Sequence, residues 1–322
     1  MNDLTPAVGD GQEPIVSLNQ VTKRFGNTVA VDNVSFDIYP GDLFGFIGPN
    51  GAGKTTTLKL TATLLQQDAG AINVAGHSTT LQPRAVRRAI GYMPDYLGVY
   101  HGLTTEEYLE FFAATYRIPL GNRAKLIEDL LVLTDLIGKR SAVVTSLSRG
   151  MQQRLGLARA LIHDPKVLLL DEPASGLDPR ARVEIRELLR ELARMGKTIV
   201  ISSHILADLE ELCNRIGIIE RGKLLYAGET SVALRQLHQQ QLVEVRVVEP
   251  VADAIKVIEA IPEVESVEAE NGSMFVTLRA DAENESVIAS QLVANRFSLL
   301  YLSRQSVKLE DAFLSITEGR VQ

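Results

Sequence analysis

The chain has 322 residues, 45% of them hydrophobic and 23% charged, which is the composition of an ordinary folded protein long enough for two domains. The formal net charge of −7 and the acidic pI near 5.4 argue against a protein that binds nucleic acid through a basic face. The single cysteine, Cys213, excludes an intramolecular disulfide, so the cytosol is the expected compartment. The apolar runs are the size of strands and fall far short of the about 20 residues that span a bilayer, so no segment is expected to cross a membrane.

The amino-terminal residues 1–14 are polar and lack the basic and apolar regions of a signal peptide, so we expect a flexible tail there. From residue 15 to residue 230, strand-like runs alternate with helical patterns. This alternation predicts an α/β domain with a largely parallel sheet and a β-rich first part. Its expected strands are residues 15–21, 29–38, 43–47, 71–74, 167–170 and 199–203.

Two helical regions stand out within this domain. Between residues 104 and 137, apolar side chains recur at helical spacing, so we expect a helical subdomain over about residues 95–150. Residues 182–195 have the clearest amphipathic pattern, and Gly196 is expected to end that helix. The apolar stripe, which indicates packing against the core, comprises Ile185, Leu188, Leu189 and Leu192.

A glutamine-rich segment, residues 231–241, is expected to be a linker to an accessory domain over residues 242–322. The patterns in that domain follow the order β-α-β-β-α-β, which is typical of the ferredoxin-like α+β plan. Asn271 and Gly272 predict a hairpin between its middle strands, and a last short helix is expected at 309–316. The expected strands are 242–248, 264–269, 274–279 and 298–303, and the expected helices are 251–260 and 283–296. No catalytic cluster is recognisable in this part.

The first chemical motif follows the expected strand at 43–47. It fits the phosphate-binding pattern G-x-x-x-x-G-K-[ST] and precedes an expected helix, a context that distinguishes it from a glycine-rich structural turn. Backbone N–H groups and the helix N-terminus would cradle phosphates, Lys54 would neutralise their charge, and Thr55 would ligate Mg²⁺. The expected nucleotide-binding residues are Gly48, Pro49, Asn50, Gly51, Ala52, Gly53, Lys54, Thr55 and Thr56.

The apolar run at 167–170 ends in two carboxylates, Asp171 and Glu172. Nucleotides bind at the edge formed by the carboxyl ends of parallel strands. We therefore expect Asp171 to hold Mg²⁺ through water and Glu172 to polarise the attacking water in phosphoryl transfer. Without the upstream phosphate loop, the same pair would be interpreted as two solvated acids at the end of a strand.

Residues 147–154, Leu-Ser-Arg-Gly-Met-Gln-Gln-Arg, resemble the signature motif of the ATP-binding cassette (ABC) family, which is usually Leu-Ser-Gly-Gly-Gln. Taken alone, the segment indicates only a helix N-cap at Ser148. The resemblance implies that Ser148 and Gly150 bind the γ-phosphate of an ATP held by the phosphate loop of a second subunit, and a helix N-terminus suits that anion. Arg149 and Met151 depart from the usual pattern.

Further motifs of the family follow in the expected order. Residues 174–178 resemble the loop that communicates across the dimer, and Phe25 stands where an aromatic ring stacks on adenine. His204, which in isolation would be read as structural, matches the histidine that contacts the γ-phosphate and orients Glu172 or water. Asp95 replaces the glutamine that the family usually has there. It keeps an oxygen ligand for metal or water but lacks the amide donor.

The ABC family contains both transporter ATPases and soluble machines that act on DNA or ribosomes. One nucleotide domain, no long heptad arm and no basic extension favour a transporter, with a soluble DNA- or ribosome-associated ATPase as the alternative. A protein that only binds nucleotide is a third hypothesis, which the presence of Lys54, Thr55 and Glu172 disfavours.

Among the transporters, Asp95, Arg149 and the ending at 309–313 resemble bacterial exporter ATPases of the drug-resistance and ABC-2 permease group. The resemblance implies an ATPase that uses ATP and Mg²⁺. It also implies a homodimer beneath a separate membrane permease, at the cytoplasmic face of the membrane, with no nucleic-acid partner.

Overall fold

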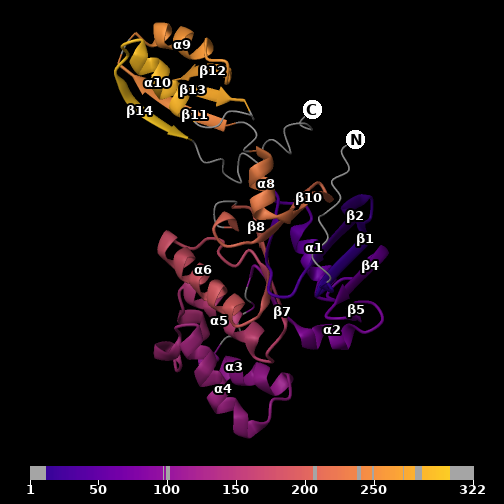
Figure 1. Cartoon of the computed structure of the whole chain (residues 1–322). Coiled ribbons are helices and arrows are strands. Elements are labelled where there is room, and N and C mark those ends of the chain that lie inside the picture. Colours follow the sequence, from indigo (N-terminus) through magenta and orange to yellow (C-terminus); the bar gives the residue numbers. More distant parts are fainter. Residues whose placement is uncertain are drawn as a thin grey trace. The chain divides into compact units, whose positions relative to one another are not determined.

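The computed structural model describes residues 12–96, 98, 102–205, 209–237, 241–248, 250–270, 272–279 and 285–304, which fall into two units that divide after Thr230 (Figure 1). The expectations for residues 1–11, for Asn271 and for the short helix at 309–316 lie outside the described residues. Among the described helices, none combines the length and the apolar character that a bilayer crossing requires.

The first unit contains a small antiparallel sheet with the strand order β2-β1-β4-β5. Its strands are β1 (Val16–Phe25), β2 (Thr28–Ile38), β4 (Ala69–Val74) and β5 (His77–Ser78). Alternate side chains of each long strand are buried on one face, as Val16 and Leu18 are on β1. The β-rich first part expected from the sequence is thereby confirmed.

A second sheet of the first unit has six strands in the order β10-β9-β3-β8-β7-β6. They are β3 (Leu43–Ile47), β6 (Ile90–Met93), β7 (Val167–Asp171), β8 (Thr198–Ser203), β9 (Arg215–Glu220) and β10 (Lys223–Glu229). All neighbours are parallel except β9 and β10, which confirms the largely parallel sheet. Every residue of β7 and β8 is buried, which explains why these strands show no alternating polarity.

The helices of the first unit are α1 (Lys54–Thr61), α2 (Pro83–Ala89), α3 (Thr105–Thr115), α4 (Leu120–Leu133), α5 (Arg149–Leu161) and α6 (Pro179–Arg194). In Figure 1, α3, α4 and α5 lie together, away from the small sheet, and form the expected helical subdomain. Helix α6 begins three residues before its expected start. It does so because Asp178 caps it, with Oδ1 accepting a hydrogen bond of 2.9 Å from the Ala181 N–H.

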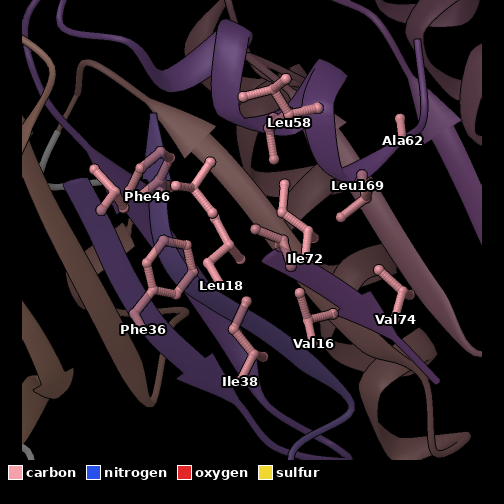
Figure 2. Packing of buried hydrophobic residues seen from close by; sticks show 14 of the residues in the cluster. Val16, Leu18, Phe36, Ile38, Phe46, Leu58, Ala62, Ile72, Val74 and Leu169 are labelled. Atoms are coloured by element: carbon pink, nitrogen blue, oxygen red, sulfur yellow. The ribbon is translucent and has the colours of Figure 1, made fainter. Parts of the chain in front are cut away.

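The two sheets share one hydrophobic core through α1. Figure 2 shows Leu58 of α1 and Ala62, the C-cap of this helix, beside Leu169 of β7, with side chains of β1, β2 and β4 completing the cluster. Across the two sheets, Phe36 and Phe44 stack with ring centroids 5.3 Å apart. Helix α1, and with it the end of the phosphate-binding segment, is therefore held between the two sheets.

Helix α5 contacts the six-stranded sheet at its carboxyl end. A Cβ added to Gly91 of β6 would overlap the Ala160 carbonyl oxygen and would lie 2.9 Å from Leu168 Cδ2. Beyond the helix, a ring nitrogen of His163 hydrogen-bonds to the Ile90 carbonyl oxygen at 2.8 Å. Only a glycine allows α5 to approach β6 this closely, so the last turn of α5 is fixed on the sheet.

The second unit has the expected β-α-β-β-α-β order: β11 (Gln241–Val247), α9 (Val251–Glu259), β12 (Val264–Glu270), β13 (Ser273–Leu278), α10 (Ser286–Ala294) and β14 (Leu299–Arg304). Its strands pair antiparallel in the order β12-β13-β11-β14. Val245, Ile258 and Leu292 belong to a core made by this unit alone. The first part of the segment 231–241, expected to be a linker, belongs to helix α8 (Thr230–Leu237), because alanine, leucine and arginine in this stretch are good helix formers.

Candidate functional site

The phosphate-binding segment lies between β3 and α1, as its pattern predicts. Gly53 is the N-cap of α1 and has a φ of 113°, which a residue with a Cβ adopts only with strain. The Lys54 side chain is buried, and its ammonium donates hydrogen bonds to the carbonyl oxygens of Gly48, at 2.6 Å, and Pro49, at 3.3 Å. The lysine side chain therefore folds back along its own loop, which places its ammonium group close to the N-terminus of α1.

Asp171 stands at the carboxyl end of β7, completely buried, and contacts α1. Its Oδ1 accepts hydrogen bonds from the Thr55 hydroxyl, at 3.0 Å, and from the Ser202 hydroxyl, at 2.6 Å. Its Oδ2 is also buried, yet it has no hydrogen-bond partner among the residues that the structure describes. A buried acceptor without a donor is costly unless a ligand satisfies it.

The electrostatics of Asp171 follow from this position. Burial raises the pKa of its carboxyl group above the ordinary value, and the hydrogen bonds from Ser202 and Thr55 oppose that rise. The negative charges of Asp95 and Glu172 raise the pKa further. The site therefore disfavours a negative charge on Asp171, and a bound cation would reverse that preference.

The Glu172 carboxylate lies between Lys54 and His204. Its Oε1 is 3.5 Å from Lys54 Nζ, and its Oε2 is 2.8 Å from Nδ1 of His204. Its backbone has a φ of 49°, a left-handed conformation that costs a non-glycine residue about 1–2 kcal/mol. The Glu172 N–H donates to both the hydroxyl and the carbonyl oxygen of Ser202, at 3.0 Å and 3.2 Å, and these bonds hold the conformation.

The predicted residues Lys54, Thr55, Asp171, Glu172 and His204 are thus joined by direct contacts. Ser202, which holds both acids, was missed by sequence reasoning, although its place two residues before the histidine is a usable signal.

Tyr92 was also missed. It lies on β6 opposite Leu169, so it shares a sheet face with Asp171, two residues farther along β7. Its hydroxyl is buried and has no hydrogen-bond partner within the described part of the chain. Burial raises the pKa of this phenol, and the charges of Asp171 and Asp95 add to the rise. Asp95, just beyond β6, is exposed and acts on Asp171 through its charge.

Two predicted elements lie apart from this cluster. Ser148 caps α5, with its hydroxyl accepting a hydrogen bond of 3.3 Å from the Met151 N–H. Among the described contacts, no hydrogen bond or ion pair joins Ser148 to the phosphate-binding segment, and Gly150 packs instead against α6. Phe25, at the end of β1, is 48% exposed, with Lys23 Nζ 5.4 Å from its ring centroid.

Comparisons with known proteins identify the family. A sequence profile described as ABC transporter matches residues 31–175. Nod factor export ATP-binding protein I of Ralstonia nicotianae is 34% identical over 314 residues, which are 97% of this chain and 96% of that protein. The chain belongs to the ABC transporter family. Linearmycin resistance ATP-binding protein LnrL of Bacillus subtilis, another similar ABC protein, is 30% identical over 94% of this chain and 98% of its own length.

Solved structures share the cassette fold. An ATP-binding subunit of an ABC transporter superposes with a TM-score of 0.63 at 29% identity, over 69% of this chain and 93% of the other. The ATP-binding cassette MJ0796, a dimer with bound ADP and Pi in a post-hydrolysis state, superposes with a TM-score of 0.61 at 28% identity, over 67% and 98% of the two chains. The protein is thus the ATP-binding, ATP-hydrolysing subunit of an ABC transporter, rather than a soluble DNA- or ribosome-associated ATPase.

Proposed function

We propose that this ABC subunit powers export through a separate membrane permease and works as one of two copies that enclose ATP between them. The contact cluster of Lys54, Glu172, His204, Thr55 and Asp171 carries the proposal, because it joins a phosphate-binding cation to two carboxylates. The relatives named for Nod factor export and linearmycin resistance support export, and the dimeric cassette neighbour supports two copies.

Each ATP would be bound by two subunits. In one subunit, residues 48–56, which include Lys54, would hold the phosphates, and the ring of Phe25 would stack on adenine. The other subunit would contribute Ser148 and Gly150, which explains why they lie at an exposed helix N-terminus and apart from their own phosphate-binding segment. Closure on ATP and reopening after hydrolysis would then drive the permease.

Mg²⁺ fits the oxygen atoms at this site. Thr55 would ligate the ion directly, Asp171 would hold it through water, and Asp95 would add a further oxygen. Support comes from the buried Oδ2 of Asp171, which no described residue satisfies, and from the 3.0 Å contact between Thr55 and the same carboxylate. When bound, the ion would neutralise charge on the phosphate oxygens of ATP.

Glu172 is the proposed group that polarises the attacking water. Its carboxylate would accept a hydrogen bond from the water while the water oxygen attacks the γ-phosphorus in line with the leaving ADP. His204, 2.8 Å from Oε2, would orient this carboxylate and contact the γ-phosphate with its other ring nitrogen. Lys54 would stabilise the negative charge that spreads over the transferred phosphoryl group.

Exposed apolar side chains on the helical subdomain support a permease contact there. Phe111 of α3 is 48% exposed, Leu120 at the start of α4 is 76% exposed, and Tyr96, beside Asp95, is also 76% exposed. A helix of the permease would cover these side chains. The subunit would then act at the cytoplasmic face of the membrane, attached through the permease.

The test compares Mg²⁺-dependent ATP hydrolysis and mass in solution for the wild-type chain and for Glu172→Gln. Glu191→Gln, a change in an exposed glutamate of α6, is the matched control. We expect Glu172→Gln to lose hydrolysis by a factor of about 100 or more, the scale on which removing a catalytic base acts, and to form a stable dimer in ATP. Wild-type hydrolysis in Glu172→Gln would refute the assigned role, and a monomer in saturating ATP would refute the two-subunit site.

A further inference from the structure

Arg149 is, with Met151, a departure of the signature segment from the family pattern, and its position needs an explanation. It is the first residue of α5, directly after the Ser148 cap, and it is exposed. A positive charge at a helix N-terminus is unfavourable, because the helix dipole is already positive there. No hydrogen bond or ion pair of Arg149 is found within the described part of the chain. Local helix stability and ion pairing therefore do not explain the residue.

The structure shows what the guanidinium contacts. A Cβ added to Gly176 would overlap the guanidinium of Arg149, lying 2.5 Å from Nη1 and 2.8 Å from Nη2. Gly176 has a φ of 67°, so any side chain there is disfavoured by its backbone as well. The flat cation therefore covers the bare backbone of Gly176. Next to this contact, a Cβ on Gly150 would lie 3.4 Å from the Ala181 Cβ, so the first turn of α5 packs on the start of α6.

A short path connects Gly176 with the proposed water-polarising residue. The N–H of Ser175, the residue before Gly176, donates a hydrogen bond of 3.0 Å to the Glu172 carbonyl oxygen. The turn from 172 to 175 is thus closed on Glu172 itself, whose φ of 49° depends on its surroundings. A shift of Gly176 would loosen this turn and change the direction of the Glu172 carboxylate.

We propose that Arg149 is a positioning residue for hydrolysis: its guanidinium holds Gly176 in place and thereby keeps Glu172 of the same chain in its working conformation. The inference rests on the role proposed above for Glu172. It connects the signature segment, which would contact the ATP of the second subunit, with the water-polarising carboxylate of its own subunit. Closure at one site would then influence hydrolysis at the other.

The test compares Arg149→Ala and Arg149→Lys with the wild type, and Arg194→Ala, a change at an exposed arginine at the end of α6, is the control. We expect Arg149→Ala to lower kcat about tenfold, with KM for ATP changed by less than twofold and an unchanged melting temperature. Lysine carries the charge but lacks the flat fork, so Arg149→Lys should resemble Arg149→Ala. If Lys restores kcat, or if KM rises instead, Arg149 acts as a charge on phosphate and the proposal is wrong.

Two further measurements separate this contact from the catalytic assignment. Amide hydrogen exchange of the peptide over residues 172–178 should be faster in Arg149→Ala, because the Ser175 N–H loses protection. Unchanged exchange would overturn the proposal, whatever Glu172→Gln shows about catalysis. Gly176→Ala should lower kcat less in the Arg149→Ala background than in the wild type, by a factor of at least about 3. Equal losses in both backgrounds would also overturn it.

Discussion

Replacing Asp171 by asparagine is expected to stabilise the folded chain while abolishing its activity. The two hydrogen bonds to this side chain, from Thr55 and Ser202, both end at Oδ1, and an amide oxygen can accept both. The amide group would replace Oδ2, which is buried and has no donor among the described residues. Asp171→Asn therefore removes a buried charge and keeps both hydrogen bonds, and the burial of an amide group without a described acceptor reduces the gain.

The pH dependence of the gain follows from the raised pKa of Asp171, which has burial as its main cause. A raised folded-state pKa means that the folded chain binds the proton more tightly than the unfolded chain does. Stability is therefore lost as the pH rises from the unfolded value near 3.8 through the folded value, and the loss is complete above it. We expect Asp171→Asn to exceed the wild type by about 1–2 kcal/mol at pH 7, with the difference vanishing below pH 4.

Urea unfolding in EDTA without nucleotide, repeated between pH 4 and pH 8, measures this difference directly. Mg²⁺-dependent hydrolysis, measured in parallel, should fall by a factor of about 100 or more, since the proposed metal site loses its charge. A variant that is less stable than the wild type at pH 7 would refute the reasoning from the unpartnered Oδ2. A difference in stability that does not change with pH would refute the assignment to the carboxyl group.

Three other features are tested by four further substitutions. Ser202→Ala should destabilise the first unit by about 1.5–3 kcal/mol in urea, since it removes a hydrogen bond to the Asp171 carboxylate, and a loss below about 0.5 kcal/mol would contradict this. Tyr92→Phe should leave the free energy of unfolding unchanged or raise it by about 1 kcal/mol, because the buried hydroxyl has no described partner. Tyr226→Phe, the matched control, should destabilise the folded chain, because that hydroxyl donates a hydrogen bond of 2.9 Å to the Glu229 carbonyl oxygen. Ile258→Ala should lower the stability of the second unit by about 2–5 kcal/mol, with ATP binding changed by less than twofold. Hydrogen exchange measured separately for each unit checks this, and faster exchange in both units would contradict the prediction.

The motifs with strict local patterns could be predicted from the sequence. The phosphate-binding segment combines glycines with a lysine at fixed spacing, and the run before Asp171 is apolar because β7 is buried on both faces. The stripe on α6 was also predictable, because Ile185, Leu189 and Leu192 recur at helical spacing and all are buried. In these cases the local backbone conformation, or the burial of one face, restricts which residue types fit at each position.

Contacts between distant segments could not be predicted. Nothing local indicates that β8 lies between β3 and β7, and this order alone brings Ser202 to Asp171. The contact of Arg149 with Gly176 likewise depends on how α5 packs against α6. The start of α6 was placed too late because its apolar stripe begins only at Ile185, although Asp178 followed by Pro179 is a local signal for a helix start. The strand order and the contact of Arg149 with Gly176 are set by packing across the core rather than by neighbours along the chain.

The close approach of Gly91 to Ala160 fixes the carboxyl end of α5, so a tilt of the helix moves mainly its N-terminal end. The helix has 13 residues, so Ser148 lies roughly 18 Å from the fixed end, at about 1.5 Å per residue. A tilt of about 3° at Ala160 would move the Ser148 hydroxyl by roughly 1 Å over that length. The residue at position 91 therefore sets the angle at which the far end of the helix is presented. A larger side chain at position 91, far from the phosphate-binding segment, would therefore displace Ser148, the serine proposed to contact the ATP of the second subunit.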